Sequence, residues 1–339
     1  LKISGGTALL TNSSSIATNI VIGNNTTGQT STAVIDITSG ELNSQTADGS
    51  LRFGPQTGDN GTNCTGTLNL DGGTLTISRV HQGTQAGTGV INSTFNFNGG
   101  TLKAYASTNF ASTFMTGLDF AYVKSGGAKI DTDGVIGNNG NVVIAQPLLD
   151  GGGGGGLTKL GTGTLTLTGA NSYTGATIIN GGKLAITAPY NAITATTVNN
   201  TGRLKINSSG VTPSSLGTVS LNTGSGLEFD VGSFDVANQP ALDVGTLNAN
   251  DNYAIDLSGT NILSSTTITL LTYTTKTGSG IPTIGNLPPG VSLGGPPVDT
   301  GSSIEITVDL GSSTPFTWSI GDGDWDTSSF NWNSNLDVY

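Results

Sequence analysis

Apolar residues recur in short alternating runs, and each run follows one or two glycines. Between Thr164 and Thr168, threonine and leucine alternate strictly. A period of two is typical of a β-strand with one buried face, so we expect Leu165 and Leu167 to point into a core and the threonines to face solvent. The phrase of glycine, a variable residue and an apolar residue occurs at residues 4–10, 38–43, 71–77, 98–104, 125–131 and 180–186, with degenerate copies at 200–206, 222–229 and 243–249.

The spacing of these phrases drifts along the chain. With the apolar residue after the glycine as a marker, the step from Leu42 to Leu75 is 33 residues and the step from Leu184 to Leu204 is 20. Short strands and Gly/Asn turns at such a period predict a β-solenoid. Each coil would hold two or three strands, and coils would stack in parallel at roughly 4.8 Å. The predicted fold class is therefore an all-β parallel solenoid, with irregular insertions that leave the coils as loops.

Asparagines stand at the expected corners of this solenoid. Asn171, Asn180, Asn199 and Asn200 all lie between predicted strands. Asparagine tolerates the left-handed backbone conformation, and its side-chain amide can bond to the neighbouring coil. We therefore interpret these residues as corner residues and not as ligands.

Two segments depart from the repeat within the solenoid, which we place at residues 1–262. Residues 104–123 are rich in aromatic side chains and hold the only Met, which predicts a short helix or an inserted loop whose rings pack in the core. The six glycines at 151–156 predict a flexible break. No Lys-Ser/Thr pair follows them, so we do not interpret them as a phosphate-binding loop.

The C-terminal part changes character. Residues 263–312 hold paired prolines, two apolar strands within 263–278 and a last alternating strand at 303–309, so we expect capping strands there. Residues 313–339 form a Trp-rich linker or the start of a following module. Large aromatic side chains pack against other surfaces, so we predict an assembly interface, on the cap or on a neighbouring module, at Trp318, Trp325 and Trp332.

Composition and charge argue against several partners. Only 10% of the 339 residues are charged and the net charge is −11, which disfavours nucleic acid and anionic membranes, because basic patches bind both. Cys64 is the only cysteine, so no intrachain disulfide is expected. No apolar run is long enough for a membrane span. The chain begins without the charged and apolar regions of a signal peptide, which indicates an excerpt of a longer precursor.

One copy of the repeat is less degenerate than the others. Its elements are Leu157–Lys159, Gly161–Leu167, Gly169–Gly175 and Gly181–Leu184, which read Leu-Thr-Lys, Gly-x-Gly-Thr-Leu-x-Leu, Gly-x-Asn-x-Tyr-x-Gly and Gly-Gly-x-Leu. This series closely resembles the passenger-associated, or autotransporter-associated, β-strand repeat of bacterial surface proteins. The resemblance implies a right-handed parallel β-helix, export to the cell surface or the medium, and no catalytic residues or cofactor. In such proteins a Trp-containing phrase usually opens a module, so the Trp-rich tail implies that another module follows.

An enzyme is the sharpest rival interpretation, because parallel β-helices also host polysaccharide lyases and hydrolases. Such reactions need acid pairs on adjacent coils, often beside a basic residue. Arg52, Arg79 and Arg203 stand isolated in the sequence, without an acid cluster at coil spacing, and His81 has no partners for a triad or a zinc site. We therefore expect no catalytic site. A cleft with two or more carboxylates beside an arginine would reverse this expectation.

Two Asp-rich turns are the only candidates for a metal site. Alternate carboxylates can bind Ca²⁺, but a calcium loop also needs further ligands and a closing bidentate acid, which neither turn has. We interpret both as solvated turns, one with Asp131 and Asp133 and the other with Asp322, Asp324 and Asp326. Ice binding through a flat threonine array is also disfavoured, because the other coils do not repeat the Thr164–Thr168 row.

The sequence thus predicts a non-enzymatic structural module of an exported bacterial surface protein, which assembles end to end or in tandem into an extracellular fibre or sheath. Its partners would be other copies or neighbouring modules. The alternative is an adhesin that binds glycans or matrix, and a polysaccharide lyase or hydrolase ranks below both. The adhesin would need an accessible aromatic groove lined by Tyr105, Phe110, Phe114 and Tyr122.

Overall fold

The computed structural model describes residues 1–10, 20–23, 30–44, 49–55, 63–84, 89–105, 111–133, 140–186, 195–207, 214–230, 240–259, 266–289 and 291–309. The predicted assembly interface lies outside these residues and remains a prediction. The same holds for Phe110 and for the acidic turn with Asp322, Asp324 and Asp326.

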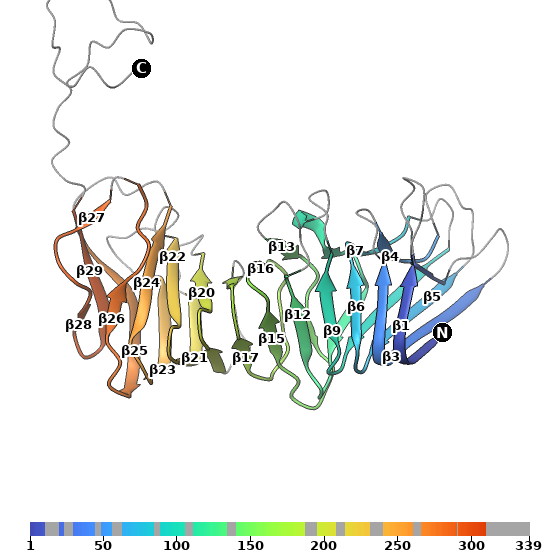
Figure 1. Ribbon diagram of the computed structural model, residues 1–339, viewed down its shortest axis with the longest axis horizontal. Coiled ribbons are helices and arrows are strands. Elements are labelled where there is room, and N and C mark those ends of the chain that lie inside the picture. Colours follow the sequence, from blue (N-terminus) through green and yellow to red (C-terminus); the bar gives the residue numbers. More distant parts are fainter. Residues whose placement is uncertain are drawn as a thin grey trace, which may run out of the picture.

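The chain winds into a long rod of stacked coils (Figure 1). In the described residues, strands of successive coils pair in parallel and form an 11-stranded and an 18-stranded sheet that both run along the rod. This arrangement confirms the predicted all-β parallel solenoid. The 11-stranded sheet consists of β2 (Ile20–Ile22), β4 (Ser50–Phe53), β7 (Arg79–Gln82), β10 (Met115–Thr116), β13 (Val142–Ile144), β16 (Thr164–Leu167), β18 (Lys183–Ile186), β20 (Arg203–Ile206), β22 (Gly226–Asp230), β24 (Tyr253–Ser258) and β26 (Pro282–Ile284).

The 18-stranded sheet divides into two arms. It begins with β1 (Lys2–Leu10) and β3 (Ser31–Ser44); the first half of β3 pairs with β5 (Cys64–Leu70) and its second half with β6 (Thr74–Ile77). The short arm continues from β5 through β8 (Ile91–Phe97), β11 (Phe120–Val123) and β14 (Leu149–Asp150). The long arm continues from β6 through β9 (Thr101–Ala104), β12 (Ala128–Asp131), β15 (Leu157–Leu160), β17 (Thr177–Ile179), β19 (Ala195–Val198), β21 (Ser214–Leu221), β23 (Leu242–Ala249) and β25 (Thr266–Thr277).

The end of the short arm explains the drift in repeat length. Up to β16 a coil places one strand in each arm and one in the 11-stranded sheet, whereas the described residues of the coils that begin with β17 and β19 place one strand in the long arm and one in the 11-stranded sheet. Leu42, Leu75 and Leu102 align in one row in the three-strand part, and Leu184 aligns with Leu204 in the two-strand part. The period therefore shortens where the coil loses one of its three sides.

One marker residue belongs to a different sheet from the one expected. The phrase at 243–249 suggested that Leu247 follows Leu227 in the same row. In the structure Leu227 pairs with Ile255, and Leu247 lies in β23 opposite Val219. The glycine of this phrase, Gly245, sits inside a strand and not at a corner, so the phrase marks the other sheet.

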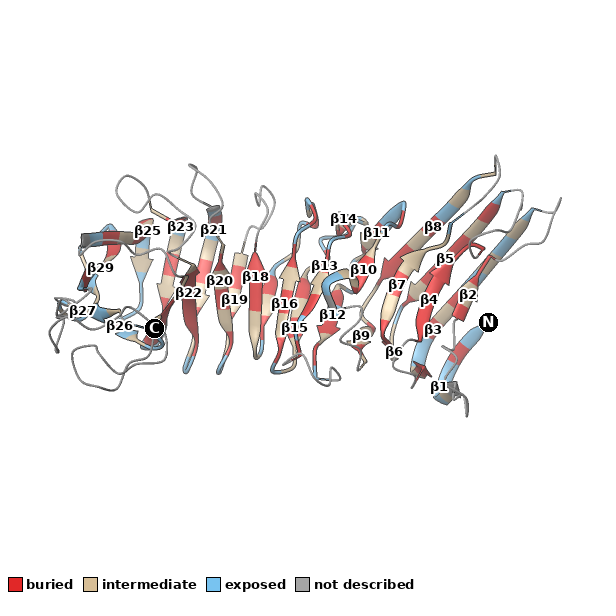
Figure 2. Ribbon diagram, turned by 90° about the horizontal axis from the view of Figure 1, so that it is seen from above, coloured by how far each residue is buried: buried red, intermediate tan, exposed pale blue. Residues whose placement is uncertain are grey.

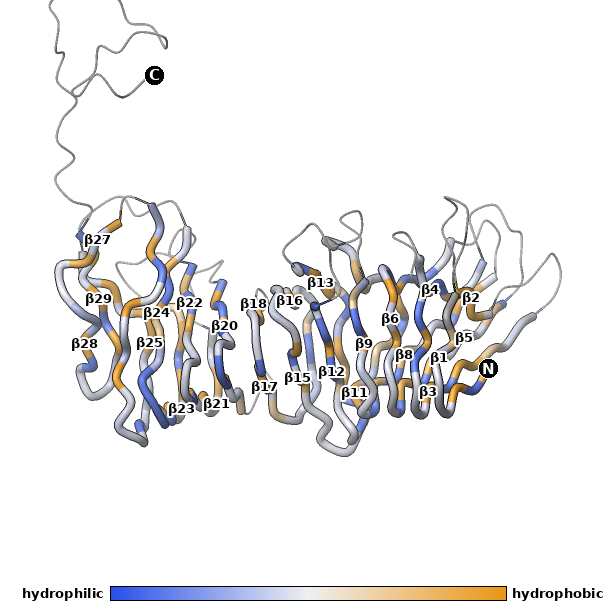
Figure 3. The backbone as a smooth tube through the Cα atoms, in the orientation of Figure 1, coloured by the Kyte–Doolittle hydropathy of each residue, from blue (hydrophilic) through white to orange (hydrophobic). Residues whose placement is uncertain are grey.

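The core is a continuous apolar column. Leu165 and Leu167 are buried while Thr164 and Thr166 are half-buried, as the alternation predicts. Figure 2 shows buried residues along the whole rod, and Figure 3 shows hydrophobic positions alternating with hydrophilic ones within the strands. Burying each large apolar side chain contributes about 1.5–3 kcal/mol, which makes the column the main source of stability. Its fully buried rings include Phe53, Phe95, Phe97 and Phe229.

Asparagines stack at one corner, as predicted. The side-chain amide of Asn199 donates to Oδ1 of Asn180 at 2.9 Å, and Asn222 and Asn250 repeat this contact on the next two coils at 2.6 and 2.8 Å. Asn200 adopts a φ of 47°, in the left-handed region that asparagine tolerates. These amides join successive coils by side-chain bonds that supplement the backbone ladder.

Residues 104–123 contribute more regular structure than an insertion would. They contain the short 3-10 helix η1 (Ala111–Thr113), but also β10 and β11, which pair in register with strands of both neighbouring coils. Phe114 and Met115 are buried, as expected for side chains that pack in the core. The aromatic content therefore belongs partly to regular coil positions.

Two of the six glycines at 151–156 lie very close to the backbone of neighbouring coils. A Cβ on Gly155 would lie 1.8 Å from the carbonyl oxygen of Lys124, and a Cβ on Gly156 would lie 2.0 Å from that of Ala176. Both oxygens belong to the backbone of neighbouring coils. Glycine is required at Gly155 and Gly156 because the coils approach too closely there for any side chain.

The solenoid continues beyond residue 262 and ends in an antiparallel cap. Residues 266–277 form the single strand β25, where the sequence suggested two, and β25 still pairs in parallel with β23. The cap consists of β27 (Ser292–Leu293), β28 (Val298–Asp299) and β29 (Ser303–Asp309), and β29 pairs antiparallel with β25. The strand predicted at 303–309 thus closes the long arm.

Candidate functional site

The repeat at residues 157–186 places a lysine inside the core. Lys159 is fully buried in β15, in a row between Ile130 and Ile179. The alternation of the strand forces this position, because Leu157 and Lys159 point to the same side. A charge there requires polar partners, since burying an unpaired ammonium is costly.

Backbone oxygens at the adjoining corner supply those partners. The Lys159 Nζ donates to the carbonyl oxygens of Leu160 and Gly161 at 2.8 Å each and of Gly181, on the next coil, at 3.3 Å. Burial lowers the pKa of Lys159 to about 8, against the opposing effect of the Asp133 and Asp131 carboxylates. The side chain therefore fastens a corner to the following coil and offers no open surface to a substrate.

Tyr173 makes a buried polar contact within its own coil. It is fully buried, and its hydroxyl lies 2.9 Å from Oγ1 of Thr177, which is also fully buried. Burial raises the pKa of Tyr173 to about 12, so the phenol stays protonated. Nearby, Asn171 accepts a hydrogen bond from the backbone N–H of Leu148 and donates to the carbonyl oxygen of Gly169, both at 2.9 Å. The polar residues of this repeat thus satisfy one another and the neighbouring backbone.

A charged cluster on the 11-stranded sheet was missed at the level of sequence. Glu228, only 6% exposed, pairs with Lys183 and lies 3.0 Å from the Nζ of Lys205. Burial alone would raise the pKa of Glu228, but the hydrogen bonds from the two lysines hold it below its usual value. One coil further, Asp256 lies 2.7 Å from the Nε of Arg203. Arg203 is therefore not isolated, and the expectation of no acid cluster at coil spacing was wrong.

The sequence signal that could have revealed this charged cluster is the residue that follows each apolar marker residue. Lys205, Glu228 and Asp256 each follow an apolar marker residue of the 11-stranded sheet, and they form one row across β20, β22 and β24. The cluster offers paired carboxylates and cations. Each carboxylate is engaged in ion pairs, and Asp256 also accepts hydrogen bonds from the backbone and side chain of Asn286.

The first Asp-rich turn joins neighbouring coils through an ion pair and hydrogen bonds. Asp131 lies 3.4 Å from the Nζ of Lys103 and accepts a hydrogen bond from the N–H of Asp133. Asp133 accepts hydrogen bonds from the backbone N–H of Thr162, at 2.6 Å, and from its hydroxyl. The backbone bond is the main cause that lowers the pKa of Asp133. Within the described ranges, no group of three or more His, Cys, Asp and Glu side chains is arranged to hold a metal ion.

The remaining candidate residues for catalysis lie together on β4 and β7 but serve the fold. His81 pairs with Arg52 in register, and its ring nitrogens lie 2.9 Å from the Gln82 carbonyl oxygen and 3.4 Å from the Ser50 hydroxyl. Burial lowers the pKa of His81, with the positive charges of Arg79 and Arg52 acting in the same direction. The described contacts of the His81 ring are thus with a backbone carbonyl oxygen and a hydroxyl group.

The aromatic residues proposed for a glycan groove separate in the structure. Phe114 is buried, and Tyr105 and Tyr122 are half-buried. An accessible pair does exist on the outer face of β11: Phe120 is 45% exposed and stacks on Tyr122, with ring centroids 5.4 Å apart and an interplanar angle of 11°. Lys124 lies 5.7 Å from the centroid of the Tyr122 ring. The pair forms a flat platform and not a groove.

These features define a parallel β-solenoid whose polar residues mainly fasten coil to coil. Residues 157–186 match the family described as Passenger-associated-transport-repeat. The chain therefore carries this passenger repeat, at the residues where the resemblance was expected. Such a repeat places it in an exported bacterial protein, at the cell surface or secreted.

A curated relative supports this assignment over a short stretch. The chain is 43% identical over 63 residues to a protein named Adhesin BmaC autotransporter from Brucella suis biovar 1 (strain 1330). The alignment covers 17% of this chain and 2% of that protein, so the chain spans only a small part of the relative. No solved structure matched the chain. In the described parts of the chain, no helix has the length and apolar character needed to cross a membrane.

Proposed function

We propose that this chain is a non-enzymatic structural module of a bacterial surface protein, and that its rod shape is its function. The observation that carries the proposal is the unbroken parallel pairing of the 11-stranded sheet from β2 to β26 around one apolar column. Such a rod resists bending because every coil is bonded to the next along its length. The paired state of Glu228 and Asp256 supports a structural use of the acidic residues over a catalytic one.

We further propose that modules assemble end to end or in tandem into a fibre or sheath. Among the described strands, β1 pairs only with β3 and β2 only with β4, so the outer edges of β1 and β2 are where a further coil would pair. Unpaired strand edges are templates for further parallel pairing. A coil from a neighbouring module or from a second copy would extend both sheets there.

Assembly is expected to lengthen the rods with rising protein concentration, because edge pairing between copies follows mass action. Negative-stain electron microscopy and sedimentation velocity on the purified chain, over a wide concentration range, measure this directly. Filaments whose width equals that of a single rod support the proposal. Monomeric rods of constant length at every concentration would contradict assembly between copies, while leaving tandem arrangement within one chain to be tested in native surface material.

The platform of Phe120 and Tyr122 favours a second function, adhesion to neutral glycans. Flat aromatic faces can pack against the apolar face of a sugar ring, much as they pack against other apolar groups. Beside Tyr122 in the sheet, the side-chain amide of Asn96 donates to Oδ1 of Asn69, and that of Asn69 donates to Oδ1 of Asp36, both at 2.7 Å. The name of the Brucella relative also points to adhesion.

Native gels that contain a soluble neutral polysaccharide, such as dextran or xyloglucan, test this second function. The wild-type chain is expected to migrate more slowly in such gels, and Phe120→Ser is expected to abolish the retardation because it removes half of the platform. Val90→Ser serves as the control, since Val90 is an apolar side chain of similar exposure, 55%, without a ring. Equal migration of all three proteins with and without polysaccharide would exclude the platform as a site for these glycans.

A further inference from the structure

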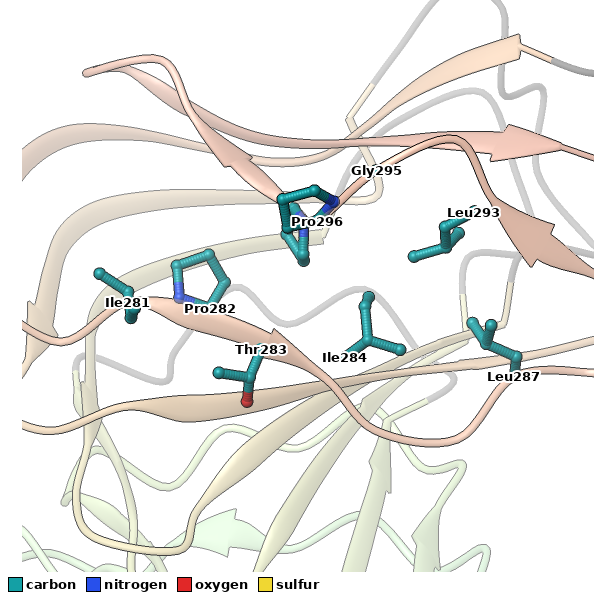
Figure 4. A pocket seen from close by; sticks show the side chains of 9 residues that line it. Ile281, Pro282, Thr283, Ile284, Leu287, Leu293, Gly295 and Pro296 are labelled. Carbon is teal, nitrogen blue, oxygen red and sulfur yellow. The ribbon is translucent and has the colours of Figure 1, made fainter.

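An apolar groove lies at the C-terminal end of the 11-stranded sheet. Its volume is about 510 Å³. Ile281, Pro282 and Ile284 line one wall, and Leu293 and Pro296 approach from the other, with the side chains facing the space between them (Figure 4). The groove thus separates the last strand of the solenoid from the loop that joins β27 to β28.

Two large hydrophobic side chains are exposed in the C-terminal part of the described chain. Ile281 is 57% exposed and Val298, in β28, is 54% exposed. They are two of only six large hydrophobic side chains that are exposed in the described residues. Ile281 also lines the groove, so the groove has an exposed apolar side chain at its wall.

The groove is better suited to binding side chains than to pairing with an added strand. Strand β26 pairs only with β24 in the described part of the chain, so its outer edge is open. Proline carries no N–H, however, and Pro282 lies in this edge strand while Pro296 and Pro297 lie in the opposite wall. Proline removes ladder donors and so blunts an edge against strand addition. Proline rings and aromatic rings pack well against each other, as in the recognition of proline-rich segments.

Aromatic residues follow β29 in the sequence, and the end of β29 lies beside this groove. Strand β29 ends at Asp309, which lies opposite Ser292, and the Ser292 hydroxyl donates to the carbonyl oxygen of Asp309 at 2.7 Å. Val308 lies opposite Leu293, a wall residue. The described part of β29 therefore ends at Asp309, next to the pair of Val308 and the wall residue Leu293. Residues 310–339 contain no Lys or Arg but hold all three tryptophans and two phenylalanines, Phe316 and Phe330.

We propose that the groove is the docking site for the chain's own Trp-rich segment, and that Trp318 is its first anchor. Trp318 lies nine residues after Asp309, and that length can reach up to roughly 30 Å when extended. A segment on the same chain has an effective concentration on the order of millimolar, well above that of a second copy in dilute solution. Docking would cover Ile281 and the proline wall, and this inference does not depend on fibre formation.

Tryptophan fluorescence of the full-length chain reports on the surroundings of this segment alone. All three tryptophans, Trp318, Trp325 and Trp332, lie in the segment, so no other part of the chain contributes to the signal. In the wild type we expect emission shifted to shorter wavelength than in urea, and slow quenching by acrylamide. Ile281→Asp places a charge in the groove at an exposed position, and it is expected to move both quantities toward the values of the urea-unfolded chain.

Val90→Asp is the matched control, because Val90 is 55% exposed and receives the same change far from the groove. It is expected to leave the emission and the quenching unchanged, and circular dichroism should show that both variants remain folded. Trp318→Phe, which keeps a ring, should retain slow quenching of the remaining tryptophans. Wild-type emission equal to that in urea, or emission insensitive to Ile281→Asp, would overturn the proposal. So would a shift that appears only as protein concentration rises, since a second copy would then fill the groove.

Discussion

Replacing Gly155 by alanine is expected to lower the free energy of unfolding by about 3–5 kcal/mol, at the severe end for a single substitution. The added Cβ would lie 1.8 Å from the carbonyl oxygen of Lys124, which belongs to the backbone and cannot rotate away. Two coils would therefore have to separate locally. Urea denaturation followed by circular dichroism measures the loss.

Gly154→Ala is the control for this prediction. Gly154 has a φ of +70°, but a Cβ at this position meets nothing within 4 Å. Its replacement by alanine is expected to lower the free energy of unfolding by about 1–2 kcal/mol, because only the left-handed conformation is unfavourable. Equal losses for the two variants would show that backbone conformation, and not the close approach of the coils, requires glycine in this connection.

Removing the ring of Tyr173 is expected to cost a similar amount. Tyr173→Ala empties a fully buried site in the repeat coil, and large-to-small changes of this kind cost about 3–5 kcal/mol. Tyr173→Phe keeps the ring but leaves the buried Thr177 hydroxyl without its 2.9 Å partner, which costs about 1–3 kcal/mol. Denaturation of the three proteins under the same conditions gives both differences.

A second substitution separates packing from hydrogen bonding at this site. When Thr177→Val is added to Tyr173→Phe, the unsatisfied hydroxyl disappears, and part of the loss should be recovered because both partners are then apolar. A double variant that is less stable than Tyr173→Phe by the full effect of Thr177→Val alone would mean that the two hydroxyls do not interact.

The alignment of core side chains between coils was predictable from the sequence, whereas the number of strands in each coil was not. The leucine markers predicted the alignment of Leu42 with Leu75 and of Leu184 with Leu204, because side chains that share a core must repeat with the coil. The end of the short arm was not predictable, since a missing strand leaves no pattern of its own. Nor did the glycine count at 151–156 distinguish a close approach from a loose connection, because glycine suits both.

Some of the polar contacts were likewise predictable from the sequence and others were not. The alternation that buries Leu157 also buries Lys159, so this lysine could have been recognised from the strand pattern alone. The pairing of Arg203 with Asp256 could not, because the partners lie two coils apart and the intervening coil is longer than its predecessor. Ion pairs across a solenoid depend on register, and register becomes certain only where coil length is constant.

The direction of the backbone ladders has a mechanical consequence. Hydrogen bonds between coils point along the rod. When its ends are pulled, the coils can therefore unwind one at a time and not all together. A coil such as that from Leu184 to Leu204 occupies roughly 4.8 Å of the rod. The same 20 residues can reach roughly 70 Å when extended. The protein is therefore stiff under small forces, yet each coil that unwinds releases many times its own height. A surface protein built this way can lengthen under fluid shear without breaking a covalent bond.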